Sequence, residues 1–299
     1  MTADEILNER LKRIDNIPGR FVSKVSATQD EIFAELIEIL SQLKTNKGNL
    51  VLSPDNLILL DELMSEYYEV LRKGKYGSLV SGFISEMDVQ KGLINQFSEI
   101  EYNVVASVAS EAVYTQSRAT AVRQLLGDDF KTNFINVIRD QIISSIENQM
   151  SFKEMTTGLR GSFVNGDVLG QIVNWTNQVA SDRFSITDRS YSSAVAQQLE
   201  LVFGQYAGGL IKDSREFCVE RDSKFFHINE VHDWGNIKQW QGRYRRTTPD
   251  NIMQWLGGFR CQHLFIFRSL ASVPKVVIER NIANGNFKPS AAEKSLLNL

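Results

Sequence analysis

The sequence predicts a mainly α-helical protein, in which an N-terminal helical bundle precedes a small α+β module near the C-terminus. Three observations predict this fold class. Apolar residues recur every three to four positions from about residue 29 to residue 205, helix-start signals precede several of these stretches, and aromatic and β-prone residues gather after Gly209. With 299 residues, 42% of them hydrophobic, the chain can form sizeable cores.

The first two helix starts are predicted from capping residues. Thr28 and Glu31 have the spacing of a capping box, in which each side chain accepts a hydrogen bond from the other residue's backbone amide. Ser53 followed by Pro54 predicts a second start, because a serine hydroxyl accepts from an unpaired amide and the fixed φ of proline suits the first helical turn. We expect this second helix to run to about Arg72.

The middle of the chain continues the helical pattern. An alanine-rich helix is expected over about residues 98 to 126, with Gly127 closing it through a left-handed cap. Asp128 then starts another helix, whose apolar residues fall on one face that requires a partner helix. These residues are Phe130, Phe134, Val137, Ile138, Ile142 and Ile146.

A further capping box is formed by Ser151 and Glu154. Three glycines follow it, at positions 158, 161 and 166, and they predict a turn over residues 156 to 167. Two more helices are expected, over about residues 168 to 182 and 187 to 205.

The composition changes close to residue 206, where we place a domain boundary. Short β-prone runs at Lys224–Ile228 and Leu264–Phe267 predict strands. Gly257 and Gly258 predict a tight turn before Cys261, and they lack the spacing of a nucleotide-binding loop. The predicted division is a helical region over 1–205, the α+β module over 206–273, and a helical segment with a polar tail over 274–299.

The overall charge and the N-terminus limit the class of protein. A formal net charge of −3 does not indicate nucleic acid or an anionic membrane as the partner. The first residues lack the basic head and apolar stretch of a secretory signal, and no apolar run approaches the roughly 18 residues of a membrane-spanning helix. We therefore expect a protein kept inside a cell or packed into something assembled there.

The cysteines and histidines all lie between residues 218 and 263, and three interpretations of this clustering are open. The first is a zinc site, because thiolate and imidazole donors satisfy zinc; its candidate ligands are Cys218, Cys261, His263 and His227. The second is an aromatic core in which two buried thiols lie close together. The third is a nucleophilic Cys261 activated by His232 or His263. No strong catalytic motif is present, so we do not expect an enzyme.

A short basic run is the second candidate site. Cations can neutralise phosphates while aromatic rings offer stacking faces, so this run predicts contact with packaged double-stranded DNA. The alternative is a solvated loop. The cations are Lys238, Arg243, Arg245 and Arg246, interleaved with Trp240 and Tyr244.

An ordered set of motifs in the C-terminal third resembles a known family. The motifs are Asp213-Ser214-Arg215-Glu216-Phe217-Cys218, Lys224-Phe225-Phe226, Trp234, Trp240-Gln241-Gly242 and Gly257-Gly258-Phe259-Arg260-Cys261-Gln262-His263. In this order they resemble the C-terminal region of tailed-phage minor head proteins of the Mu F-like head morphogenesis family. The resemblance covers about residues 186 to 268. The family usually ends in His-Pro-x-Cys-Arg-Cys, whereas here His263 stands where a second thiol is common.

The resemblance implies a low-copy structural protein of a bacteriophage virion, assembled in the host cytoplasm. Its partners would be the portal and capsid proteins, and its role would lie in head assembly, followed by ejection with the genome. Two other functions stay open from the residues: a delivered effector with a Cys/His catalytic site, and an internal protein that contacts packaged DNA.

Overall fold

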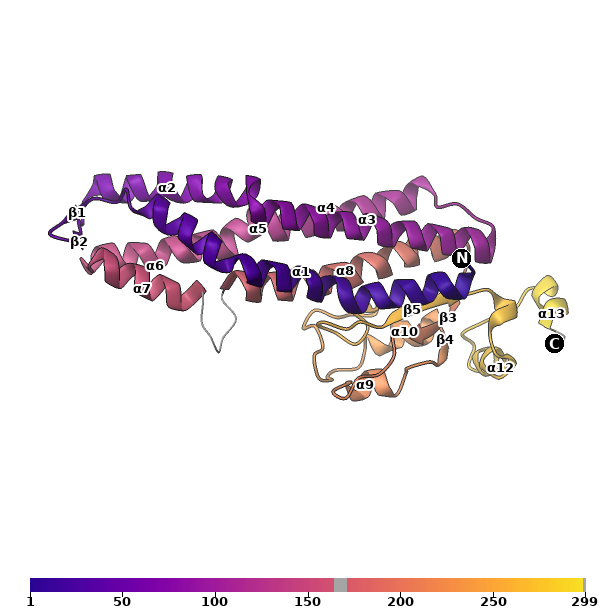
Figure 1. The fold of residues 1–299 in the computed structure, drawn as a ribbon. Helices are drawn as coiled ribbons and strands as arrows, with labels where there is room; N and C mark the ends of the chain where they lie inside the picture. The colour runs from indigo at the N-terminus through magenta and orange to yellow at the C-terminus, as the bar shows by residue number, and fades with distance from the viewer. Residues whose placement is uncertain (164–170, 298–299) are drawn as a thin grey trace. The chain divides into compact units, whose positions relative to one another are not determined.

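A computed structural model describes residues 1–163 and 171–297 of the chain. The protein is mainly α-helical with a small module of strands and helices near the C-terminus, as the sequence predicts (Figure 1). The elements up to the last long helix are α1 Ala3–Leu40, β1 Thr45–Asn46, β2 Asn49–Leu50, α2 Pro54–Lys73, α3 Lys75–Tyr102, α4 Val108–Leu126, α5 Asp128–Phe130, the π-helical η1 Lys131–Ile135, α6 Asn136–Glu147, α7 Phe152–Phe163 and α8 Gln171–Gln198. The remaining elements are β3 Phe203–Ala207, α9 Glu216–Val219, β4 Phe225–His227, α10 Ile228–Trp234, α11 Ile252–Trp255, β5 Leu264–Arg268, the 3₁₀ turn η2 Leu270–Ser272, α12 Lys275–Ala283 and α13 Ala291–Leu297.

The chain divides into two compact units, neither of which is continuous in sequence. The first unit contains Met1–Asn16, Met87–Arg118 and Ser181–Leu299, and the second contains Ile17–Glu86 and Ala119–Ala180. Helices α1, α3, α4 and α8 each contribute residues to both units. The predicted boundary near residue 206 is wrong, because it falls inside β3 and because the first unit includes helical segments from the N-terminal half.

The second unit contains the predicted apolar face of α5, η1 and α6. Its members Phe130, Phe134, Ile138, Ile142 and Ile146 are fully buried. The face packs against α2 and α7, and the Phe134 ring meets that of Phe163 at 5.5 Å. Val137 does not share this environment and keeps 37% of its surface exposed. The face therefore has partner helices, as the sequence predicts.

Three of the predicted helix starts are confirmed, and one of them is Asp128, the first residue of α5. Ser53 caps α2, and its hydroxyl accepts a hydrogen bond from the backbone amide of Asn56 at 3.3 Å. Ser151 and Glu154 form the predicted capping box, with amide-to-side-chain distances of 2.8 and 3.1 Å. Helix α2 ends at Lys73, one residue beyond the predicted end.

The predicted start at Thr28 is wrong, because α1 begins at Ala3 and passes through it. The Thr28 hydroxyl donates to the carbonyl of Val25 at 2.9 Å and caps nothing. The predicted single helix over residues 98 to 126 is also wrong. The chain leaves α3 after Tyr102, takes a positive φ at Asn103, and starts α4 at Val108. Gly127 has a φ of −106°, so it forms no left-handed cap.

Glycines interrupt the helices less than predicted. Helix α7 continues through Gly158 and Gly161, because its apolar residues Met155, Leu159 and Phe163 are buried at helical spacing and outweigh the cost of glycine. The rest of the predicted turn, 164 to 167, lies outside the described residues, as do residues 168 to 170 of the next predicted helix. Instead of two helices the structure has α8 alone, which is continuous to Gln198.

The helices of the first unit share a buried polar network. Arg10 and Asp188 form an ion pair at 2.9 Å, with side-chain exposures of 3% and 1%. The amide of Gln90 donates to the other oxygen of Asp188 at 2.8 Å, and Ser192 accepts from Arg10 at 2.8 Å. The network therefore joins residues from α1, α3 and α8 within this unit.

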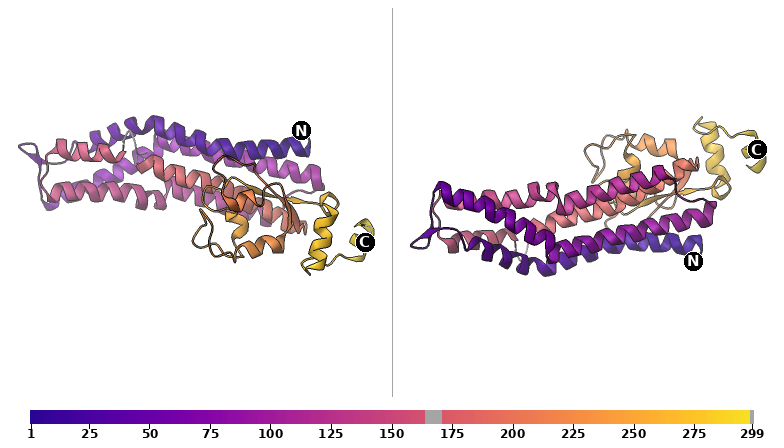
Figure 2. Two further views of the ribbon diagram at one scale, coloured as in Figure 1. Left: turned by 90° about the horizontal axis from the view of Figure 1, so that it is seen from below. Right: turned by 90° about the horizontal axis from the view of Figure 1, so that it is seen from above.

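The sheet of the first unit is antiparallel, with the order β4-β3-β5. Phe203 of the central strand pairs with His227 on one side and with Arg268 on the other. Both predicted strands are present as β4 and β5. Helices α10 and α12 contact β4. Helix α12 is the yellow helix next to the C-terminus in both views of Figure 2. The predicted helical segment after Pro274 is α12, and the tail after it continues into α13, with the Phe287 ring 5.1 Å from that of Phe203.

Across residues 1–163 and 171–297, no helix combines the length and the apolar character that crossing a membrane requires.

Candidate metal centre

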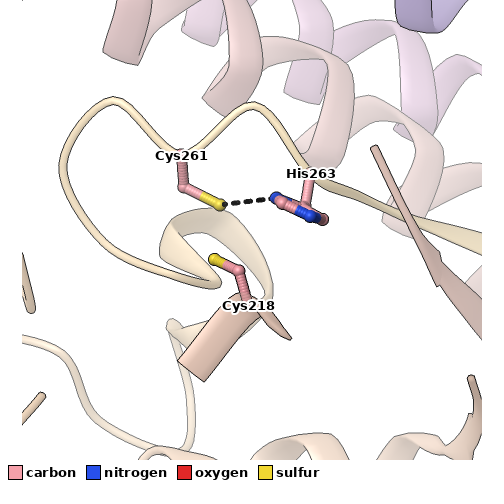
Figure 3. Close-up of side chains that lie close together, drawn as sticks. All are labelled: Cys218, Cys261 and His263. Atoms are coloured by element: carbon pink, nitrogen blue, oxygen red, sulfur yellow. Dashed lines mark hydrogen bonds between the residues drawn. The ribbon is translucent and has the colours of Figure 1, made fainter. Parts of the chain in front are cut away.

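The two cysteines and one histidine meet in the first unit (Figure 3). Cys218 lies on α9, and Cys261 and His263 lie in the segment that leads into β5. One ligand atom of each residue, the two Sγ atoms and a ring nitrogen, lie within 4.8 Å of one another. All three residues are buried, and both thiols are free. In the part of the chain that the structure describes, no other group of three such side chains has this geometry.

The neighbours of this group are polar and aromatic. His263 Nδ1 lies 3.9 Å from Cys261 Sγ, and Nε2 on the other side of the ring lies 3.4 Å from Asp222 Oδ1. The hydroxyl of Tyr206, on β3, donates to Cys218 Sγ at 3.4 Å. The Tyr206 ring stacks on the imidazole of His263 at 4.8 Å. The imidazole is therefore oriented by a stacked ring on its face and a carboxylate at its edge.

Two arginines hold the backbone of the turn that carries Cys261. Arg189, on α8, donates Nε–H to the carbonyl of His263 at 2.9 Å and also donates to the carbonyl of Cys261. Arg215 donates to the carbonyls of Gly257 and Phe259 at 3.1 and 2.6 Å. Because a planar guanidinium presents several donors in a fixed geometry, these contacts define the path of the turn.

Glycine is required at two positions of this turn. A Cβ atom on Gly257 would lie 2.6 Å from Cys218 Sγ and 3.0 Å from Cys261 Sγ. Gly258 has a φ of +95°, and a Cβ there would overlap the carbonyl of Gly242. The tight turn predicted before Cys261 is confirmed, and Gly257 makes room for the sulfur atoms.

The two thiols have opposite pKa shifts. A hydrogen bond from Cys218 lowers the pKa of Cys261 well below its usual value, and the positive charge of Arg189 and the neighbouring His263 act in the same direction. The same hydrogen bond, together with burial, raises the pKa of Cys218. Burial raises the pKa of Tyr206, whose hydroxyl stays protonated and donates. Cys261 is therefore the more acidic thiol of the pair.

A pocket of about 490 Å³ opens beside the group. All three ligand residues line it, together with Asp15, Ser214, Arg215 and Arg260. Burial raises the pKa of Asp15, and the charge of His263 opposes this shift. The wall of the pocket thus carries both acidic and basic side chains next to the sulfur atoms.

The structure does not place His227 in this group, so its prediction as a ligand is wrong. His227 caps α10: its Nδ1 accepts from the backbone amide of Asn229 at 3.1 Å, and Glu230 accepts from the amide of His227 at 2.8 Å. Its ring packs edge-on to Phe203 at 4.9 Å. His232, also on α10, lines a different pocket. Of the two histidines considered as the base for Cys261, His263 is therefore the one that lies beside it.

The predicted aromatic core surrounds the cysteines as well. Phe217, Trp234 and Tyr206 are buried in the same cluster as Cys218 and Cys261. The Trp234 ring meets that of Phe217 edge-on at 5.7 Å. The thiols therefore lie at the border between this apolar cluster and the polar pocket.

The basic run is split between two environments. Arg243 is half-buried, donates to the carbonyl of Thr247 at 2.7 Å and lies over the Trp240 ring at 5.1 Å, so its role here is structural. Lys238, Arg245 and Arg246 are exposed. A nucleic-acid contact by these three residues stays a prediction.

Sequence reasoning missed Arg189, Tyr206 and Asp222. Arg189 stands in a helical stretch with other charged residues, and nothing in its spacing distinguishes it from a solvent-facing arginine. Asp222 lies four residues after Cys218, the one local signal that could have indicated it as a neighbour of the site.

Comparison with known proteins identified no relative of the chain. No protein-family model, curated protein or solved structure matches the chain.

Proposed function

We propose that the chain is a structural minor head protein of a tailed bacteriophage, a component of the virion that associates with the portal and acts in head assembly. This proposal rests on a contact between two of the motifs that resemble the family. Arg215 of the Asp-x-Arg-x-x-Cys segment donates to the carbonyls of Gly257 and Phe259 in the second motif, and Cys218 adjoins Cys261. Motif residues that contact one another support a common ancestry better than motif residues that are scattered.

Three exposed apolar side chains in the first unit offer a surface for a partner protein. Ile100, Val105 and Val108, at the connection between α3 and α4, expose 53%, 75% and 88% of their surface. Exposed apolar surface is typical of protein interaction sites. We place the contact with the portal or capsid protein at this connection.

Co-purification tests this role. The tagged chain would be co-expressed with the portal protein encoded by the same phage genome, and we expect the two proteins to elute together. Val105→Asp with Val108→Asp should reduce the recovered portal protein without changing the melting temperature. Ile58→Asp, at an exposed apolar residue of the second unit, is the control and should leave recovery unchanged. Failure to bind portal, capsid or scaffold protein would overturn the proposal.

A delivered effector with a catalytic thiol is the second candidate, favoured by one observation. Cys261, His263 and Asp222 follow one another at 3.9 and 3.4 Å, the order of a nucleophile, its base and an orienting carboxylate. Cys261→Ala separates the candidates. A catalytic role predicts an intact fold and a lost effect on host cells, whereas the structural role predicts a lower melting temperature or defective heads.

A further inference from the structure

We propose that Cys218, Cys261 and His263 bind one zinc ion through their two Sγ atoms and Nδ1, and that the fourth coordination position faces the adjacent pocket. That position would take a water molecule or a small exchangeable ligand. This inference goes beyond the virion role and does not depend on it, because a metal centre of this kind can serve a protein of any function.

The donor atoms are close to the spacing that zinc requires. Zn–S bonds of about 2.3 Å and Zn–N bonds of about 2.0 Å at tetrahedral angles separate two sulfurs by about 3.8 Å, and a sulfur and a nitrogen by about 3.5 Å. In the structure Cys261 Sγ lies 3.9 Å from His263 Nδ1, and all three donors lie within 4.8 Å of one another. Movements of the three side chains by about 1 Å or less would bring the donor atoms to the distances that zinc requires.

The surroundings of the donors also fit a metal. A histidine ligand usually directs its second ring nitrogen to a carboxylate, which fixes the orientation of the ring. Here Asp222 Oδ1 lies 3.4 Å from His263 Nε2, and both buried atoms lack a hydrogen-bond partner in the described structure. Tyr206 donates to Cys218 Sγ, as outer groups do to ligand thiolates. Two thiolates and one divalent cation also form a neutral unit, which costs less to bury than an isolated charge.

The backbone positions the ligands in advance. Arg189 holds the carbonyls of both Cys261 and His263. Gly257 leaves beside the two sulfurs the space that a larger residue would fill. Ligands held by such supporting contacts lose little freedom when they bind a metal.

The pocket determines the fourth position. All three ligands line it, so an ion bound between them is accessible from it. Three protein ligands with one open position is the arrangement of zinc sites that exchange a ligand. Charged side chains on the wall, Asp15 and Arg260 among them, favour a small polar ligand over an apolar one.

Metal analysis of the purified full-length chain tests the site. After removal of loosely bound metal, we expect about one zinc per chain, falling at least tenfold in Cys218→Ser, Cys261→Ser and His263→Gln. His227→Asn and His232→Gln are the matched controls, since neither residue belongs to the group, and they should retain zinc. A wild-type chain that stays free of zinc when refolded with it, or cysteine variants that bind it fully, would overturn the proposal.

Cobalt substitution gives a second readout that does not depend on the folding of variants. The wild-type chain loaded with Co²⁺ should show thiolate-to-cobalt absorption in the near ultraviolet and the visible bands of a tetrahedral ion. Added imidazole should shift the visible bands if the fourth position is open. A spectrum without thiolate absorption contradicts the metal site, and a spectrum insensitive to imidazole contradicts the open position. Portal binding is measured separately, so either proposal can fail alone.

Discussion

Arg189 donates its Nε–H to the carbonyl oxygen of His263 at 2.9 Å, across 74 positions of the chain. The arginine keeps only 4% of its surface exposed, and it donates hydrogen bonds to backbone carbonyls, including that of Gln254 at 2.8 Å. A single helical side chain therefore supports the turn that carries Cys261.

We expect Arg189→Met to destabilise the first unit by about 3 kcal/mol or more, because it leaves several buried carbonyls without donors. Urea unfolding followed by the fluorescence of Trp234, Trp240 and Trp255, all in this unit, measures the effect. Arg245→Met, at an exposed arginine, should change the free energy of unfolding by less than about 0.5 kcal/mol. Equal effects of the two substitutions would show that the carbonyl contacts of Arg189 do not stabilise the turn.

Gly257→Ala should disturb the cysteine group. Its Cβ would lie 2.6 Å from Cys218 Sγ, and overpacking of this kind costs about 1 to 3 kcal/mol. The matched control is Gly92→Ala on α3, where a Cβ meets no atom within 4 Å and should stabilise the helix by about 0.5 to 1 kcal/mol. Thermal unfolding and zinc content are the measurements. Unchanged values for the Gly257 variant would mean that the turn adapts freely.

The buried ion pair of Arg10 and Asp188 predicts that substitutions at the two residues have non-additive effects on the free energy of unfolding. Asp188→Asn leaves the buried guanidinium without its counter-charge and should cost about 3 to 5 kcal/mol. Arg10→Met combined with Asp188→Leu should cost less than the sum of the single substitutions, as a double-mutant cycle in urea would measure. The exposed pair of Arg160 and Asp30 should contribute less than about 1 kcal/mol. Additive effects at Arg10 and Asp188 would contradict the coupling.

The lowered pKa of His227 predicts that the protein loses stability in mild acid. Burial lowers the pKa of His227 below its usual value of about 6.5, while Glu230 opposes the shift and His232 adds to it. As pH falls below about 6.5, the unfolded chain binds a proton that the folded chain does not, so this contribution to stability is lost down to the folded pKa. A protonated Nδ1 would also cease to accept from Asn229.

The corresponding measurement compares His227→Asn with the wild type by urea unfolding at about pH 7.5 and about pH 5.5. Asparagine is a good helix cap, so the variant should match the wild type at the higher pH and lose less stability at the lower one. His232 and His263 remain in both proteins and cancel in the difference. Identical pH profiles would exclude His227 as the source of acid sensitivity.

The sequence predicted the parts of the fold that depend on local signals. The caps at Ser53 and Ser151, the buried face that contains Phe134, and the strands β4 and β5 all follow from neighbouring residues. The Thr28 start failed because buried residues at helical spacing, Phe21 and Val25 among them, extend the same helix toward the N-terminus. A capping pair is a start signal only where no apolar face precedes it.

The candidate site was predictable in composition but not in geometry. The clustering of cysteines and histidines indicated Cys218, Cys261 and His263, which the structure brings together. His227 was misassigned because its Nδ1 serves the backbone of α10, a role that local sequence does not distinguish from metal binding. Arg189 acts through contacts with residues more than 60 positions away, and no periodic pattern encodes such contacts.

The first unit combines three separate segments of the chain, so a fragment that contains only part of the last segment lacks residues that this unit needs. Residues 206 to 299 alone would begin inside the central strand β3, without Phe203, which pairs with His227 on one side and with Arg268 on the other. They would also lack Asp182, which accepts from the amide of Arg260 at 2.7 Å, and Arg189. Such a fragment should emerge from expression unfolded or insoluble, so recombination that exchanges C-terminal segments between related genes would have to carry α8 with them.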